Sequence, residues 1–165
     1  MDRTGLLTLC AYNAYANHLV LNVVQCLSTA ELVRPASPSH ESVQKLLEHM
    51  LGLEATFLAR CQGTSPDWPD SPTLAELIHY WGEVEQATHD FITAQTEADL
   101  AREVVPFNQR TLHFPVWQLL LQVFMHSAHH RGELSVVLTE LGHPLPTLDI
   151  ILHFVEQSGQ TWPSR

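Results

Sequence analysis

Four long segments whose apolar residues recur every three or four positions place the strongest constraint on how this chain can fold. We expect helices from about Thr4 to Leu27, from Ser42 to Cys61, from Thr73 to about Leu100, and from Pro115 to Leu141. Stretches rich in proline and serine separate the first three. Each helix has an apolar face that must be buried against another, so the sequence predicts an all-α four-helix bundle.

The helix starts carry recognisable signals. Ser42 is the expected N-cap of the second helix, with Ser39 as its rival. The third helix opens with Thr73-Leu-Ala-Glu76, the pattern of a capping box. Pro115 suits the first turn of the fourth helix, because proline lacks the backbone N–H that would go unpaired there.

Two shorter segments complete the predicted architecture, a single domain over residues 1–165. Residues 102–114 form either a short hairpin or an extended crossover before the fourth helix. A short helix from Asp149 to Gln157 follows the fourth helix and covers one end of the bundle.

Composition excludes several classes of partner. The 165 residues carry 18 Asp and Glu against 8 Lys and Arg, a net charge of −10. Such a chain lacks the cationic surface that nucleic acids and anionic membranes require. No run of 18 apolar residues predicts a membrane span, and the N-terminus has no signal-peptide pattern. Three widely spaced cysteines without a C-x-x-C pair favour a reducing, cytoplasmic location.

The fourth helix contains a pattern suited to metal binding. At 100° per residue, His130 lies about 40° from His126, and Glu133 lies about 20° to the other side. This face continues the apolar line of the helix, so both imidazoles point into the bundle. His49, beside the apolar face of the second helix, could supply a third nitrogen. By spacing alone, metal ligation and ordinary hydrogen bonding both remain open, because the chain has 11 histidines.

Three imidazoles without a fourth protein ligand are typical of a catalytic rather than a structural zinc site. A metal held in this way lowers the pKa of bound water or thiol, or polarises a carbonyl group. Glu133 would then orient an imidazole by accepting its hydrogen bond, or act as a general base.

Other sites fit less well. Ser127 stands where a zinc protease needs glutamate. A di-iron site needs two E-x-x-H helices, and the two matches here lie at helix ends, at Glu76 and Glu140. Cys10 and Cys61 lack any pattern of a nucleophile. His129 is rotated about 60° from His126, which favours an edge or interface role. The remaining histidines are assigned to surface or loop positions: His18, His40, His79, His89, His113, His143 and His153.

Several motifs, in order and with suitable spacing, resemble those of the DinB family (damage-inducible DinB, or DinB/YfiT-like putative metalloenzymes) over nearly the whole chain. They are Tyr12-Asn13-Ala14-Tyr15-Ala16-Asn17, the stretch from Ser42 to His49 followed by Glu54, Val116-Trp117, His126-x-x-x-His130-Arg131-Gly132, Leu141-Gly142-His143 and Pro146-x-x-Asp149. The most specific is H-x-x-x-H-R-G, after which the family usually has Gln where this chain has Glu133.

The resemblance implies a four-helix bundle, usually dimeric, with a divalent metal on His49, His126 and His130. Zinc or nickel is favoured, with iron, copper or manganese as further candidates, because imidazole suits several of these ions. Glu133 in place of Gln adds a carboxylate that could bind the metal directly. Arg131 is expected to pair with an acid such as Glu54 or Glu48 rather than with a substrate carboxylate.

Two functions follow as hypotheses. The first is a metal-dependent transferase or hydrolase that uses a low-molecular-weight thiol or water against a small electrophile, since the chain offers no nucleophile of its own. The second is a metal-stabilised dimeric module of a stress response, which acts by binding and has no catalytic activity. The family name records damage-inducible expression and names no reaction.

Overall fold

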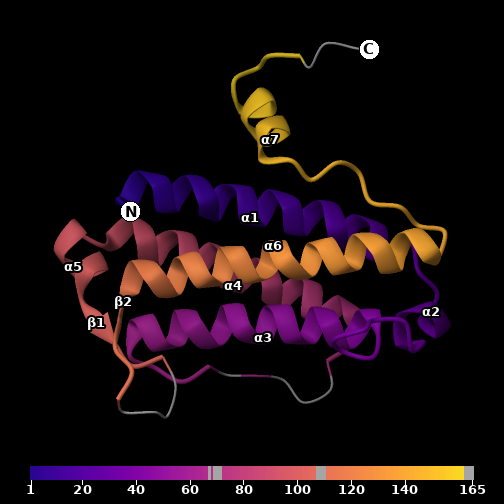
Figure 1. Cartoon of the computed structure of the whole chain (residues 1–165), viewed down its shortest axis with the longest axis horizontal. Coiled ribbons are helices and arrows are strands. Elements are labelled where there is room, and N and C mark those ends of the chain that lie inside the picture. Colours follow the sequence, from indigo (N-terminus) through magenta and orange to yellow (C-terminus); the bar gives the residue numbers. More distant parts are fainter. Residues whose placement is uncertain (67, 69–71, 107–110, 162–165) are drawn as a thin grey trace.

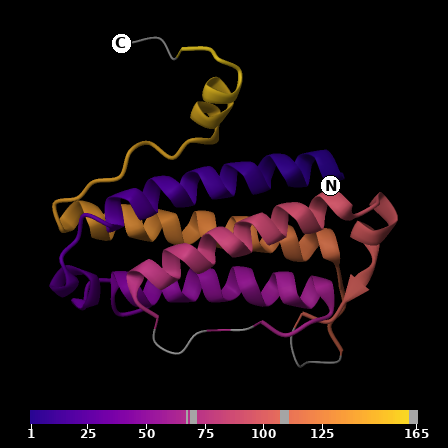
Figure 2. The same cartoon turned by 180° about the vertical axis from the view of Figure 1, so that it is seen from behind.

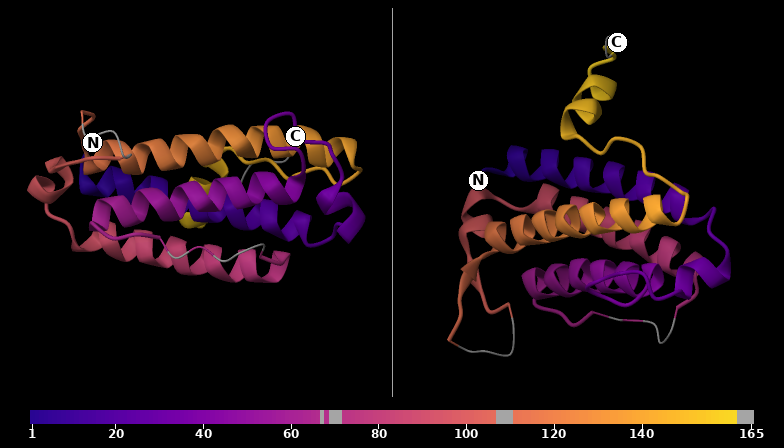
Figure 3. Two further views of the ribbon diagram at one scale, coloured as in Figure 1. Left: turned by 90° about the horizontal axis from the view of Figure 1, so that it is seen from below. Right: turned by 45° about the vertical axis from the view of Figure 1, so that its right-hand side comes forward.

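Four long helices lie side by side in the computed structural model, which describes residues 1–66, 68, 72–106 and 111–161 (Figure 1). They are α1 (Arg3–Val24), α3 (Val43–Gln62), α4 (Leu74–Ala94) and α6 (Val116–Glu140). Both α1 and α3 contact α4 and α6. One diagonal of the bundle therefore joins α1 to α3 and the other joins α4 to α6 (Figure 3). The predicted all-α bundle is confirmed.

Shorter elements connect the long helices. They are α2 (Thr29–Val33), α5 (Glu97–Ala101), β1 (Glu103–Val104), β2 (Phe114–Pro115) and α7 (Ile150–Gln157). The two strands are antiparallel, with Glu103 opposite Pro115 and Val104 opposite Phe114, so the chain adopts the hairpin rather than the extended crossover. Residues 107–110, in the middle of the segment for which the hairpin or crossover was predicted, lie outside the described residues. Helix α2 was not predicted.

The C-terminal helix α7 was predicted, but its place in the fold differs from the expectation. It lies outside the four-helix bundle on the side of α1, which it contacts (Figure 2). His153 is its one buried residue and lies against Tyr15, with ring centroids 4.9 Å apart. His153 was therefore wrongly assigned to the surface.

The third helix was predicted to run to Leu100, but α4 ends at Ala94. Gln95 has an extended backbone, and Thr96 caps a new helix: its hydroxyl accepts from the backbone N–H of Asp99, whose carboxylate accepts from that of Thr96. A second capping box inside an apolar pattern thus divides one predicted helix into two.

The other helix starts largely agree with the prediction. The capping box at Thr73 and the N-cap at Ser42 are confirmed. Pro115, however, is the N-cap of α6 rather than its first residue.

Two apolar clusters make up the core. The α2-end core has Leu46, Met50, Leu77, Trp81 and Leu134 among its members, and the hairpin-end core has Leu6, Cys10, Phe57, Ile92 and Leu120. Along α1, α3 and α6, buried polar side chains lie between the residues of the two cores: Asn13, Asn17, Glu54, Ser127 and Arg131. The functional candidates are concentrated at this level of the bundle. None of the helices in the described ranges is long and apolar enough to cross a membrane.

Candidate metal centre

The imidazoles of His49, His126 and His130 meet where α3 packs against α6. The Nε2 atom of His126 lies 2.9 Å from that of His49 and 3.2 Å from that of His130. Metal–nitrogen bonds of about 2.0–2.1 Å place the nitrogens of a tetrahedral ion about 3.4 Å apart. The spacing around His126 is therefore close to what a shared ion requires.

Hydrogen bonds alone do not satisfy the ring nitrogens of His126 in this arrangement. A ring nitrogen has one lone pair or one hydrogen, so Nε2 of His126 can make one good hydrogen bond, yet two imidazole nitrogens approach it. Its other nitrogen, Nδ1, is buried and has no hydrogen-bond partner among the described residues. A cation that accepts several lone pairs fits this donor set.

The pKa values of the three imidazoles favour the neutral, metal-binding form. Burial, and then the neighbouring His130 and His49, lowers the pKa of His126 from 6.5 to about 4. Burial is also the largest cause of the lowered pKa of His49 and of His130. At neutral pH all three rings therefore keep a lone pair for a metal.

These shifts predict a pH-dependent stability of the metal-free protein. As pH falls from about 6.5 to about 4, the unfolded chain takes up a proton at His126 before the folded protein does. The free energy of unfolding should therefore fall across this window, as urea titrations of chelator-treated protein at pH 7, 5.5 and 4 would measure. The variant His126→Gln should show a shallower fall, and an unchanged slope would contradict the assignment.

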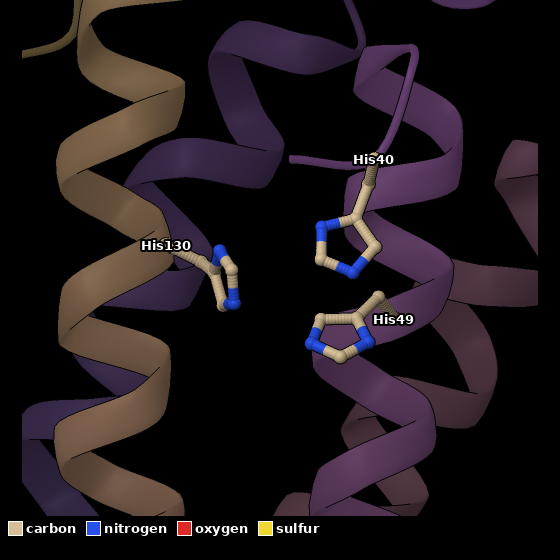
Figure 4. A group of neighbouring side chains, drawn as sticks. All are labelled: His40, His49 and His130. Atoms are coloured by element: carbon tan, nitrogen blue, oxygen red, sulfur yellow. The ribbon is translucent and has the colours of Figure 1, made fainter. Parts of the chain in front are cut away.

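A fourth histidine, His40, joins the group although it was assigned to the surface or loops. It does lie in the loop before α3, half-buried, but its ring stacks on His49 with centroids 3.8 Å apart and planes 25° apart. One ring nitrogen from each of His40, His49 and His130 lies within 4.8 Å of the others (Figure 4). A loop has no periodicity that could have revealed this contact from the sequence.

Glu133 holds this loop against α6. Its carboxylate accepts hydrogen bonds from the Ser37 hydroxyl at 2.5 Å, the Ser39 hydroxyl at 2.6 Å and the Ser39 backbone N–H at 3.1 Å. Its Oε2 atom also lies 3.3 Å from Nδ1 of His130. Burial opposes ionisation of Glu133, but these hydrogen bonds outweigh it and lower the pKa to about 2.

His129 is exposed on α6 at the edge of this group, with its ring centroid 5.0 Å from that of His130. The histidines of the weak di-iron pattern contact acidic residues instead. His79, part of the weak di-iron pattern, is exposed and lies 3.6 Å from Glu83. His143, part of the other, lies 3.6 Å from Glu31.

Arg131 pins the helices together, as predicted, but through amides rather than by direct pairing with an acid. Its Nη1 atom donates to the side-chain oxygens of Asn13 and Asn17, both at 2.7 Å. The nitrogens of these two amides donate to Oε1 of Glu54, at 3.1 and 3.3 Å. Glu48, the other predicted partner, pairs with Lys45 instead.

Two more donors complete the hydrogen bonding of Glu54. The Ser127 hydroxyl donates to its Oε1 at 2.7 Å, and the indole N–H of Trp81 donates to its Oε2 at 3.2 Å. We call these six residues the buried polar network: Asn13, Asn17, Glu54, Trp81, Ser127 and Arg131. All are less than 5% exposed, so the network connects α1, α3, α4 and α6 within the core.

An open surface cavity of about 520 Å³ lies along α3, and His49 is the member of the histidine group that lines it. His49 lies in its wall beside Leu53, Phe57 and Trp68, and the ion pair of Lys45 and Glu48 borders it. The wall is thus mainly apolar with an imidazole at one side, a lining that suits a small organic molecule.

The comparisons with known proteins agree with this architecture. A model of the DinB family matches residues 1–160. The fold is similar to that in the crystal structure of a DinB-like protein, YjoA, from Bacillus subtilis, with a TM-score of 0.66 and 20% sequence identity over 86% of this chain and 96% of that one. At this identity the similarity concerns the fold alone. No curated protein matches the sequence.

Proposed function

The chain belongs to the DinB family, and from this premise we propose that it is a metal-dependent enzyme of the thiol-dependent transferase or hydrolase type. The observation that carries the proposal is the approach of the His49 and His130 nitrogens, from two helices, to the same nitrogen of His126. His49, His126 and His130 would hold the ion, with zinc or nickel favoured by three imidazole ligands.

A divalent ion bound there would act as a Lewis acid on a thiol, a water molecule or a carbonyl group. Two of the three thiols in the chain are poorly suited to act as the nucleophile. Cys10 and Cys61 are buried, and burial raises the pKa of each thiol to about 12. A low-molecular-weight thiol or water would therefore supply the nucleophile.

The cavity beside His49 supports a small and largely apolar electrophile as the substrate. Its walls at Leu53, Phe57 and Trp68 would exclude water from one side of such a molecule. The net charge of −10 would also disfavour a strongly anionic substrate.

Glu133 would act in this enzyme as the acceptor that orients His130. With a pKa lowered to about 2, its carboxylate is a poor general base. Its place 3.3 Å from Nδ1 of His130 suits the acceptor role, because a metal-binding imidazole commonly donates its other N–H to a carboxylate.

The second candidate is a binding module in which a metal only stabilises the bundle. The stack of His40 on His49 favours this alternative, since a fourth imidazole could close the site to substrates.

In either case we propose that the protein is a homodimer. Two large apolar side chains on similar sides of α6 support this proposal, Met125 and Val136, which are 50% and 61% exposed.

Metal analysis and activity assays together test the proposal. The purified protein should retain about one equivalent of metal after dialysis, lose it to a chelator, and recover it from zinc or nickel. The reloaded protein should then turn over a small electrophile with a thiol, or an activated ester with water. Metal retention without any turnover would favour the binding module, and no retention of zinc, nickel, copper, iron or manganese would overturn both candidates.

A further inference from the structure

We propose that His40 is a fourth ligand of the metal and that Glu133 positions it through Ser39. This inference rests on the proposed metal site and adds to it a ligand from outside the helices. A fourth imidazole closes a tetrahedral site, as in the binding module, so an enzyme with this ligand would need a five-coordinate ion to keep a position for water or a thiol. It also gives Glu133 one role toward two imidazoles, to position His130 directly and His40 through Ser39. This role accounts for the carboxylate that lies beside His130.

The first support is the place of His40. Its ring stacks on His49, and its centroid lies 5.3 Å from that of His130, with the two planes nearly perpendicular. One nitrogen of His40 belongs to the group in which all three nitrogens are within 4.8 Å of one another. Figure 4 shows the rings of His40 and His49 together on one side and that of His130 facing them.

The second support is the way in which the loop is held. Its backbone closes on itself, because the N–H groups of Ala36 and Ser37 both donate to the carbonyl of Glu41, at 2.8 and 3.1 Å. Glu41 has a φ of 68°, which is uncommon for a residue other than glycine. This tight turn and the hydrogen bonds of Ser37 and Ser39 to Glu133 hold the loop in the position where the His40 ring stacks on that of His49.

The third support is a chain of hydrogen bonds that sets the tautomer of His40. The Ser39 hydroxyl has one hydrogen and donates it to Oε2 of Glu133, at 2.6 Å. The hydroxyl oxygen of Ser39 lies 2.6 Å from Nδ1 of His40, so Nδ1 must carry the hydrogen of that contact. Nε2 of His40 therefore keeps its lone pair and is available to a metal.

The same carboxylate oxygen sets the tautomer of His130. The carboxylate of Glu133 accepts hydrogen bonds from Ser39 and likewise accepts in its 3.3 Å contact with Nδ1 of His130, so this nitrogen is the donor and Nε2 keeps its lone pair. Glu133 thus prepares two imidazoles for one ion, His130 directly and His40 through Ser39. This pattern of a ligand histidine backed by a carboxylate is common in metal sites.

The variant His40→Phe separates ligation from stacking, because phenylalanine keeps an aromatic ring over His49 but has no nitrogen. With Zn²⁺ as the probe, X-ray absorption should count four imidazoles in the unaltered protein and three in His40→Phe. The dissociation constant for Zn²⁺ should rise by at least about 10-fold, since even partners outside the ligand shell cost about 10- to 100-fold. The matched control His79→Phe, at an exposed position of α4, should change neither value.

The variants Ser39→Ala and Ser39→Thr test the positioning chain. Alanine removes the hydroxyl between His40 and Glu133 and should weaken Zn²⁺ binding by about 10-fold, whereas threonine keeps the hydroxyl and should restore the affinity. Far-UV circular dichroism would establish that each variant is folded.

Three imidazoles in the unaltered protein, with affinity unchanged in His40→Phe, would overturn the role of His40 and leave the metal site of the proposed function in place. Equal affinities of Ser39→Ala and the unaltered protein would overturn the role of Ser39 and Glu133. A protein that binds no Zn²⁺ would overturn the proposed function together with this inference.

Discussion

Replacing His126 by alanine is expected to lower the affinity for Zn²⁺ by at least about 100-fold. Loss of a residue that only supports a ligand already costs up to about 100-fold, and His126 would be a ligand itself. The reason is its central place: its Nε2 atom is the one that both His49 and His130 approach, at 2.9 and 3.2 Å. Without it, His49 and His130 come from different helices and keep only His40, from a loop, as a common neighbour. Competition titration with a chromophoric chelator measures the affinity, and elemental analysis measures the metal content.

His129→Ala is the matched control for this prediction. His129 lies on the same helix and is exposed, so its replacement removes an imidazole at the same cost in helix propensity and should leave Zn²⁺ affinity unchanged. If His126→Ala bound Zn²⁺ as tightly as His129→Ala, His126 would not be a ligand.

Replacing Arg131 by methionine is expected to lower the free energy of unfolding by about 3–5 kcal/mol, the loss found when a buried charge is left without its counter-charge, although Asn13 and Asn17 stand between the two charges here. Arg131 is 2% exposed and Glu54 is 4% exposed, and two asparagines connect them. Methionine fills much of the space but leaves the carboxylate without its cation and the oxygens of Asn13 and Asn17 without a donor. Urea unfolding of the metal-free protein, followed by circular dichroism, measures the change.

Two further variants show whether the loss arises from the buried charge. The double variant Arg131→Met with Glu54→Met should be less destabilised than the sum of the two single variants, because it removes the unpaired carboxylate along with the guanidinium. Lys45→Met breaks an exposed ion pair with Glu48 and should leave the unfolding curve nearly unchanged. A loss below about 1 kcal/mol in Arg131→Met would place the network among ordinary hydrogen bonds.

The long helices could be predicted from sequence because their apolar periodicity and their caps agree. Ser42 and Thr73 begin helices where the patterns of local hydrogen bonding predict. The predicted helix that runs on to Leu100 shows the limit of this method: its apolar pattern continues through α5, while the cap at Thr96 turns the backbone. Local capping prevailed there over apolar spacing.

The candidate site was predictable in part for a similar reason. The spacing of His126 and His130 follows from one helix, whereas the approach of His49 depends on how α3 packs against α6, and only the family resemblance selected it. His40 was missed because a loop contact leaves no periodic trace. The link from Arg131 to Glu54 was also only half predicted, because the two asparagines between them lie more than 100 residues from Arg131 in the sequence.

His126 and His130 are each followed directly by a member of the buried polar network, Ser127 and Arg131. The two histidines form one row along α6, and the two network residues form a second, parallel row. The angle between the two rows around the helix axis is fixed by the helix geometry. A designer who grafts the histidines onto another bundle would need to carry Glu54, Asn13 and Asn17 with them, because these residues set the rotation of the helix. The transplantable unit is thus a cross-section of three helices and not a four-residue motif.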